Sequence, residues 1–136
     1  MTKADRKVLT DYVRSVADDL GLKDWAIEVS DEEPIDPDAN ASCQPTYGRK
    51  YATLRFASDF REHKPESQRN TVVHELLHCH LHPLGEQAEW DLSELIGKSA
   101  DFAFCKAFRR NLEYAVDGLA GAYSKHQPLI EWPKTS

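Results

Sequence analysis

The stretch Thr71–Pro83, TVVHELLHCHLHP, contains four of the chain's six histidines. At 100° per residue its side chains separate onto two faces of a helix. The polar face holds His74, Glu75, His78 and His82, and the apolar face holds Val72, Val73, Leu76, Leu77, His80 and Leu81. We therefore predict a helix from Pro65 to about His82, ending before Pro83, with its apolar face on the core.

The spacing of His74 and His78 is suited to a metal ion. Residues one turn apart bring two imidazole nitrogens onto one cation, at about 2.0 to 2.1 Å each for zinc. Glu75 lies beside that position, where a carboxylate can take a proton from an attacking water. With six His and eleven Glu in 136 residues, chance predicts about 0.02 such H-E-x-x-H patterns. A metal site with Glu75 as general base is the favoured interpretation.

The neighbouring residues of this helix have simpler expected roles. His82 lies about 12 Å along the axis from His74, too far to share one ion, so we expect it either to support a metal ligand by contact or to cap the helix. His80 is expected to be a neutral, hydrogen-bonded core histidine, and Cys79 a small buried side chain.

Composition limits the class of protein. The 136 residues suit one domain, residues 1–136, and the net charge of −6 disfavours nucleic acid as a partner. We expect no membrane span or export signal, because no sufficiently long apolar run occurs. The widely spaced Cys43, Cys79 and Cys105 indicate reduced thiols and a cytoplasmic location.

The rest of the chain predicts an α+β fold. A capping box at Thr2 and Asp5 begins an amphipathic helix that ends before Gly21. Alternating residues predict strands at Trp25–Ser30 and Tyr51–Ala57, and a weaker strand near Ala41–Tyr47, giving a small sheet of about three strands. A long helical region follows from about Glu86 to Ser124, divided near Gly97.

The segment H-E-L-L-H-x-x-L-H, His74–His82, resembles the zincin metallopeptidases, and in particular the short gluzincin-like group that includes the ImmA/IrrE-type proteases. That resemblance implies a zincin-like fold and a zinc-dependent peptidase. It also implies that an extended peptide or protein substrate binds along an edge strand, which we place at Tyr51–Ala57.

The same group takes its third zinc ligand from a glutamate on a later helix, followed four residues on by an Asp or Asn. In this chain Glu113 and Asp117 match that pattern, in "EYAVDGLA". The resemblance implies that Glu113 binds Zn²⁺ and that Asp117 supports a zinc-bound histidine. Acidic pairs at this spacing also occur on solvated helix faces, and the other candidate third ligands are Glu89, Glu94 and Asp101.

Such sites often contain a side chain that polarises the substrate carbonyl. Tyr47, Tyr114, Tyr123 and His126 are candidates by residue type, and the sequence does not choose among them. Two other functions remain open: a zinc-binding regulatory or interaction module that does not cut, and hydrolysis of a smaller amide.

Overall fold

The computed structural model describes residues 1–135, and its strands form one mixed sheet in the order β1-β3-β2. β1 (Ala26–Val29) pairs parallel with β3 (Tyr51–Phe56), and β2 (Ala41–Pro45) pairs antiparallel with β3. The predicted α+β class and three-stranded sheet are confirmed. β3, which we expected at the edge, is instead the central strand, because β1 joins its outer side.

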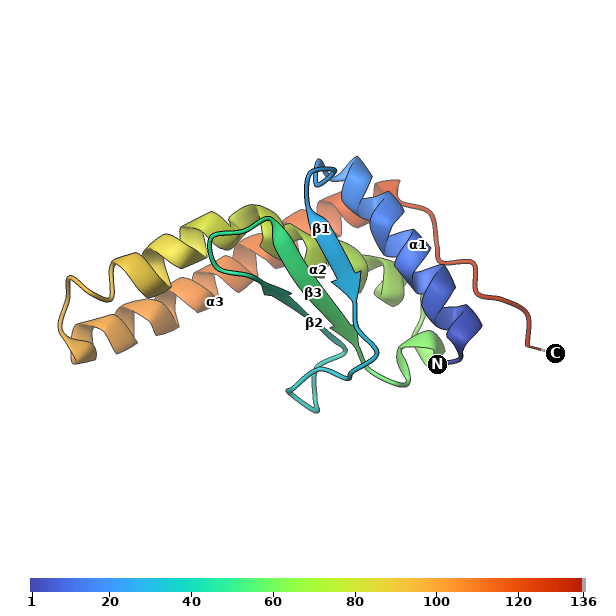
Figure 1. The fold of residues 1–136 in the computed structure, drawn as a ribbon, viewed down its shortest axis with the longest axis horizontal. Helices are drawn as coiled ribbons and strands as arrows, with labels where there is room; N and C mark the ends of the chain where they lie inside the picture. The colour runs from blue at the N-terminus through green and yellow to red at the C-terminus, as the bar shows by residue number, and fades with distance from the viewer. Residues whose placement is uncertain (136) are drawn as a thin grey trace.

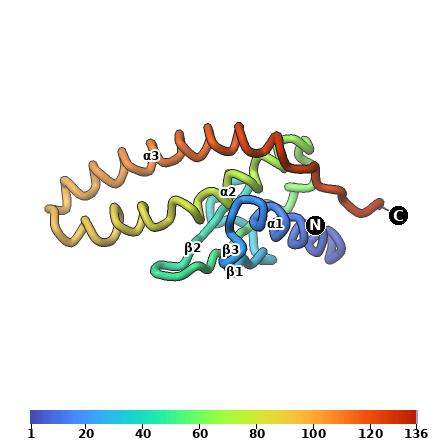
Figure 2. The backbone as a smooth tube through the Cα atoms, turned by 90° about the horizontal axis from the view of Figure 1, so that it is seen from above, coloured from blue at the N-terminus to red at the C-terminus, as the bar shows by residue number. Residues whose placement is uncertain are grey.

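Three long helices pack around this sheet: α1 (Lys3–Asp19), α2 (Pro65–Glu86) and α3 (Lys98–Tyr123). Short helical turns lie at η1 (Phe60–Glu62), η2 (Gln87–Asp91) and η3 (Ser124–His126). α2 lies between the sheet and α3, and α1 packs beside β1 (Figures 1 and 2). Among the described residues, no helix is both long and apolar enough to cross a membrane.

α2 has the two faces that the sequence predicts. Val72, Val73, Leu76 and Leu77 are buried in the core, and Cys79 is fully buried as expected. The prediction that His80 is a core histidine is wrong. His80 is exposed, and its Nε2 lies 2.5 Å from the Leu20 carbonyl oxygen. It therefore caps the end of α1 instead of filling the core.

α2 does not end at His82 as predicted, because it continues through Pro83 to Glu86 and then into the π-helical turn η2. Contacts with the β2–β3 turn hold the chain helical there. His82 Nε2 lies 3.2 Å from the Thr46 carbonyl oxygen and 2.5 Å from Glu86 Oε1, and Glu86 accepts a hydrogen bond from the Gly48 N–H. These contacts offset the one helical hydrogen bond that Pro83 cannot donate.

Beyond the sheet, the end of α2, η2 and the first half of α3 form a helical hairpin that projects from the body (Figure 1). We call residues 83–112 the arm. α3 begins after Gly97, close to the division that the sequence predicts. Over its 26 residues α3 buries only Val116 and Ala120, so its attachment to the body lies in its second half.

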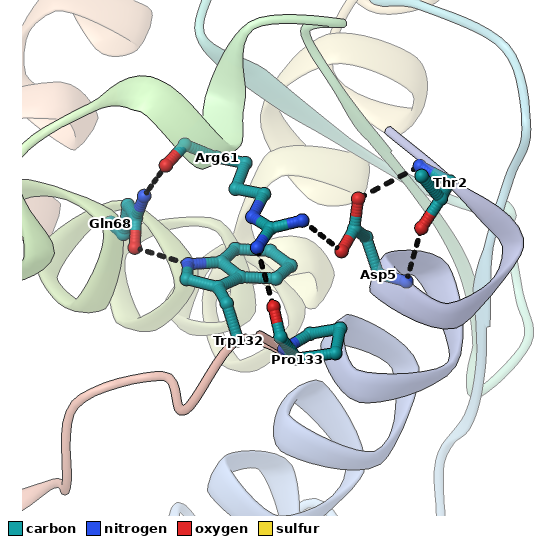
Figure 3. A network of polar contacts seen from close by, with 6 residues as sticks. All are labelled: Thr2, Asp5, Arg61, Gln68, Trp132 and Pro133. Atoms are coloured by element: carbon teal, nitrogen blue, oxygen red, sulfur yellow. Dashed lines mark hydrogen bonds and ion pairs between the residues drawn. The ribbon is translucent and has the colours of Figure 1, made fainter. Parts of the chain in front are cut away.

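A polar network ties the two ends of the chain to the body (Figure 3). The capping box of Thr2 and Asp5 is present, and Asp5 also receives a hydrogen bond from Arg61 at 2.6 Å. Arg61 donates to the Pro133 carbonyl oxygen, and Trp132 donates to Gln68. Asp5 is only 2% exposed, and hydrogen bonds from Thr2 and Arg61 hold its pKa below the usual carboxyl range.

Asp5→Asn should lower the melting temperature, because it removes the charge that Arg61 and the helix terminus stabilise. The pKa of Asp5 is lowered on folding, so its contribution is complete above the ordinary value of 3.8 and is lost as pH falls through the folded-state pKa. Thermal unfolding from neutral to acidic pH measures this difference.

Asp11→Asn is the matched control, because Asp11 forms an exposed ion pair with Lys7 on the same helix. Loss of this ion pair should change the free energy of unfolding by less than about 0.5 kcal/mol. Equal losses in the two variants, or a difference that grows on acidification, would contradict the role given to Asp5.

Candidate metal centre

His74, His78 and Glu113 are brought together by the packing of α3 against the polar face of α2. His74 and His78 lie one turn apart on α2, and the buried Val116 and Ala120 fix the register of α3 beside them. Glu113 therefore reaches the same point as the two imidazoles, although 35 residues separate it from His78. We call these three residues the metal triad.

The donor atoms of the triad lie close enough together that they could hold one metal ion. His74 Nε2 lies 3.3 Å from His78 Nε2 and 3.3 Å from Glu113 Oε2, and His78 Nε2 lies 3.2 Å from Glu113 Oε1. Ligands at about 2.0 to 2.1 Å from a tetrahedral ion are about 3.3 to 3.4 Å apart. The distances from the two imidazoles run to different oxygens of Glu113, and with one donor atom from each residue the triad lies within 4.8 Å, so it could hold one metal ion.

Asp117 orients the first histidine. Its Oδ1 lies 3.0 Å from His74 Nδ1, where a carboxylate can accept the Nδ1–H and leave the Nε2 lone pair free for a metal. Burial lowers the pKa of His78, although Glu113 opposes that shift, and this favours the neutral form that binds metals.

Glu75 is buried on the floor of the site, next to His74 in the chain, and is 9% exposed. Burial, with a further contribution from the nearby Glu113 carboxylate, raises its pKa to about 7, and the backbone amide of Cys43 opposes the shift. A carboxylate with a pKa near neutrality can both accept and return a proton.

The triad and Glu75 line a cleft of about 590 Å³ between β2, α2 and α3. The β2 side of the cleft consists of Ala41, Ser42, Cys43 and Pro45. We expected the edge strand to be Tyr51–Ala57, but β3 is bonded on both sides, and β2 is the sheet edge that borders the cleft. A polypeptide extended along the sheet edge at this site would therefore meet β2.

Over residues 1–135, the other candidate ligands do not converge with the triad. Glu89 pairs with Arg109 at 2.5 Å, Asp101 accepts a hydrogen bond from the Cys105 thiol, and Glu94 is exposed in the arm. Among residues 1–135, His74, His78 and Glu113 are the group whose donor atoms converge closely enough for a metal ion.

The four aromatic candidates for a carbonyl-polarising group also lie elsewhere. The Tyr47 hydroxyl donates a hydrogen bond to Asp91 in the arm, and Tyr114 is 70% exposed on α3. Tyr123 and His126 line a separate hollow with Leu20 and His80. The polar side chains that do line the cleft with the triad include His82, Glu86 and Arg109.

Sequence reasoning did not identify Arg109 or the β2 residues as part of the cleft. Arg109 precedes Glu113 by four residues, and so the helical period alone places it on the same face of α3. The position of β2 had no such signal, because residue alternation does not specify strand order.

These features define a candidate three-ligand metal centre with the buried carboxyl group of Glu75 beside it. Comparison with known proteins finds no matching family model, no matching curated protein and no matching solved structure.

The chain should bind one equivalent of Zn²⁺, and His78→Ala or Glu113→Gln should weaken binding by more than about tenfold, because each removes a ligand. Asp117→Asn should weaken it by about 10- to 100-fold through loss of the support to His74. Competition with a chromophoric chelator measures the affinities. Glu94→Gln is the control. The assignment of Glu113 would be contradicted if Glu94→Gln and Glu113→Gln lowered the affinity for zinc equally.

Proposed function

We propose that the protein is a zinc-dependent peptidase with a zincin-like fold, acting in the cytoplasm on peptide or protein substrates. The observation that carries this proposal is the convergence of His74, His78 and Glu113 next to the buried carboxyl group of Glu75. The resemblance of His74–His82 and of Glu113–Asp117 to the gluzincin-like group agrees with it. A zinc ion held by the triad would acidify water and polarise a substrate carbonyl.

The residues of the chain then have distinct tasks. His74, His78 and Glu113 hold the ion, and Asp117 keeps the His74 ring in the required tautomer. Glu75 accepts a proton from the attacking water as the carbon–oxygen bond forms. It returns that proton to the amide nitrogen as the carbon–nitrogen bond breaks, so the leaving group departs as a neutral amine.

Several features favour a polypeptide over a small amide as the substrate. The cleft extends from Asp36, before β2, to Trp90 in the arm, and so it offers an elongated surface instead of a closed pocket. β2 supplies an outer strand edge whose backbone groups can pair with an extended chain. We therefore place substrate along β2.

The buried Glu75 also favours catalysis over metal binding alone. A binding module needs the three ligands and their support, but it gains nothing from a carboxyl group kept out of water at a cost in solvation. Within residues 1–135, Glu75 forms no ion pair with a lysine or arginine that would give it a structural role.

Glu75→Gln should bind zinc with nearly the affinity of the parent chain and lose peptide hydrolysis by at least about 100-fold, since the amide cannot accept the proton. A randomised fluorogenic peptide library, with products identified by mass spectrometry, measures the activity.

The matched control is Glu66→Gln, at the start of the same helix and away from the cleft, which should retain full activity. The proposal would be abandoned if purified zinc-loaded protein cleaved no peptide, or if Glu75→Gln were as active as Glu66→Gln.

A further inference from the structure

A second hollow adjoins the cleft, on the arm. It has a volume of about 670 Å³ and is lined by Glu89, Trp90, Lys98, Asp101, Phe102, Cys105, Lys106 and Arg109. Glu89, Trp90 and Arg109 also line the cleft. The two hollows therefore meet at the Glu89–Arg109 ion pair, and a chain bound in one can continue into the other.

We propose that this arm hollow anchors the polypeptide substrate, by binding an apolar side chain that has an acidic neighbour. The inference rests on the proposed peptidase function, because the arm hollow would give the substrate in the cleft a second place of contact with the protein. We call the hollow the anchor site.

The apolar part of the anchor site consists of two large aromatic side chains that the fold leaves uncovered. Trp90 is 59% exposed and Phe102 is 73% exposed. The Trp90 ring is held in place by Tyr47, with ring centroids 5.5 Å apart, and the Tyr47 hydroxyl bonds Asp91. A side chain already fixed in position loses little entropy on binding, which suits it to hold an apolar group.

The charged part of the anchor site favours an acidic neighbour. Arg109 forms an ion pair with Glu89 at 2.5 Å, so these two charges cancel. The remaining charged lining residues are Lys98 and Lys106, which are positive, and Asp101, which is negative. This excess of one positive charge contrasts with a chain whose net charge is −6. It also contrasts with the other end of the cleft, where Asp36 belongs to the acidic loop DEEPIDPDAN. The difference in charge gives the bound chain a preferred direction.

The distance from the anchor site to the metal triad sets the spacing in the substrate. Phe102 precedes Glu113 by eleven residues on α3, or about 17 Å at 1.5 Å per residue. An extended chain advances about 3.3 Å per residue. The anchored side chain therefore lies about five residues from the bond that is cut.

The test measures binding separately from cleavage. A randomised 14-residue peptide library is captured on zinc-loaded Glu75→Gln protein, and the bound peptides are sequenced. Captured peptides should be enriched in an aromatic or aliphatic residue beside Asp or Glu. In the same background, Phe102→Ala should reduce capture of these peptides by about tenfold, and Lys106→Glu should remove the preference for the acidic neighbour.

Leu95→Ala is the matched control, because Leu95 is 80% exposed in the arm but does not line the anchor site. Phe102 is exposed, so its variant should keep the circular dichroism spectrum and melting temperature of the parent. The anchor site is overturned if no peptide is captured, or if Phe102→Ala and Leu95→Ala capture the same peptides equally. It is also overturned if sedimentation shows that Phe102→Ala dissociates a dimer, since a second copy would then be the occupant.

Wild-type protein incubated with the captured peptides separates this inference from the proposed function. Cleavage about five residues from the anchored side chain supports both. Capture of the expected peptides without cleavage leaves the anchor site standing and removes the peptidase function. Cleavage at sites with no apolar residue at that distance removes the anchor site and leaves the peptidase function.

Discussion

The packing of α3 against α2 is the contact on which the candidate metal centre depends. α2 is held firmly, since Val72, Val73, Leu76 and Leu77 are buried beneath the sheet. α3 contributes only Val116 and Ala120 to the buried interior, so a small apolar contact determines where Glu113 lies. The position of Glu113 therefore depends strongly on this contact, and a metal ion bridging Glu113 to His74 and His78 would add a direct connection between the two helices.

The sequence predicted which of these side chains lie together better than it predicted what surrounds them. His74, Glu75 and His78 lie on one helix, so the 3.6-residue period was sufficient to place them on one face. Glu113 and Asp117 required a resemblance to a family motif, and the structure places both side chains against His74. The pairing between α2 and α3 is a tertiary contact, and periodicity within each helix does not determine it.

Errors in the prediction arose where tertiary contacts overrule local rules. Pro83 normally ends a helix, but His82 and Glu86 hold the β2–β3 turn and keep the chain helical to η2. Likewise the residues of β3 alternate as in any strand with one buried face. This pattern is the same for an edge strand and for a central strand. Its central position follows from the parallel pairing with β1, which the intervening sequence does not specify.

The charges of Glu75 and Glu113 link the pKa of Glu75 to the binding of a cation by the triad. Glu75 and Glu113 are close enough for the Glu113 carboxylate to raise the pKa of Glu75, so the two negative charges repel each other. A divalent cation held by His74, His78 and Glu113 would offset that repulsion, and imidazoles would provide donors without adding negative charge. Burial supplies the larger part of the Glu75 shift. Burial and the Glu113 charge act in the same direction on Glu75, so the bound cation, by offsetting the Glu113 charge, would lower the pKa of Glu75 from its value without metal.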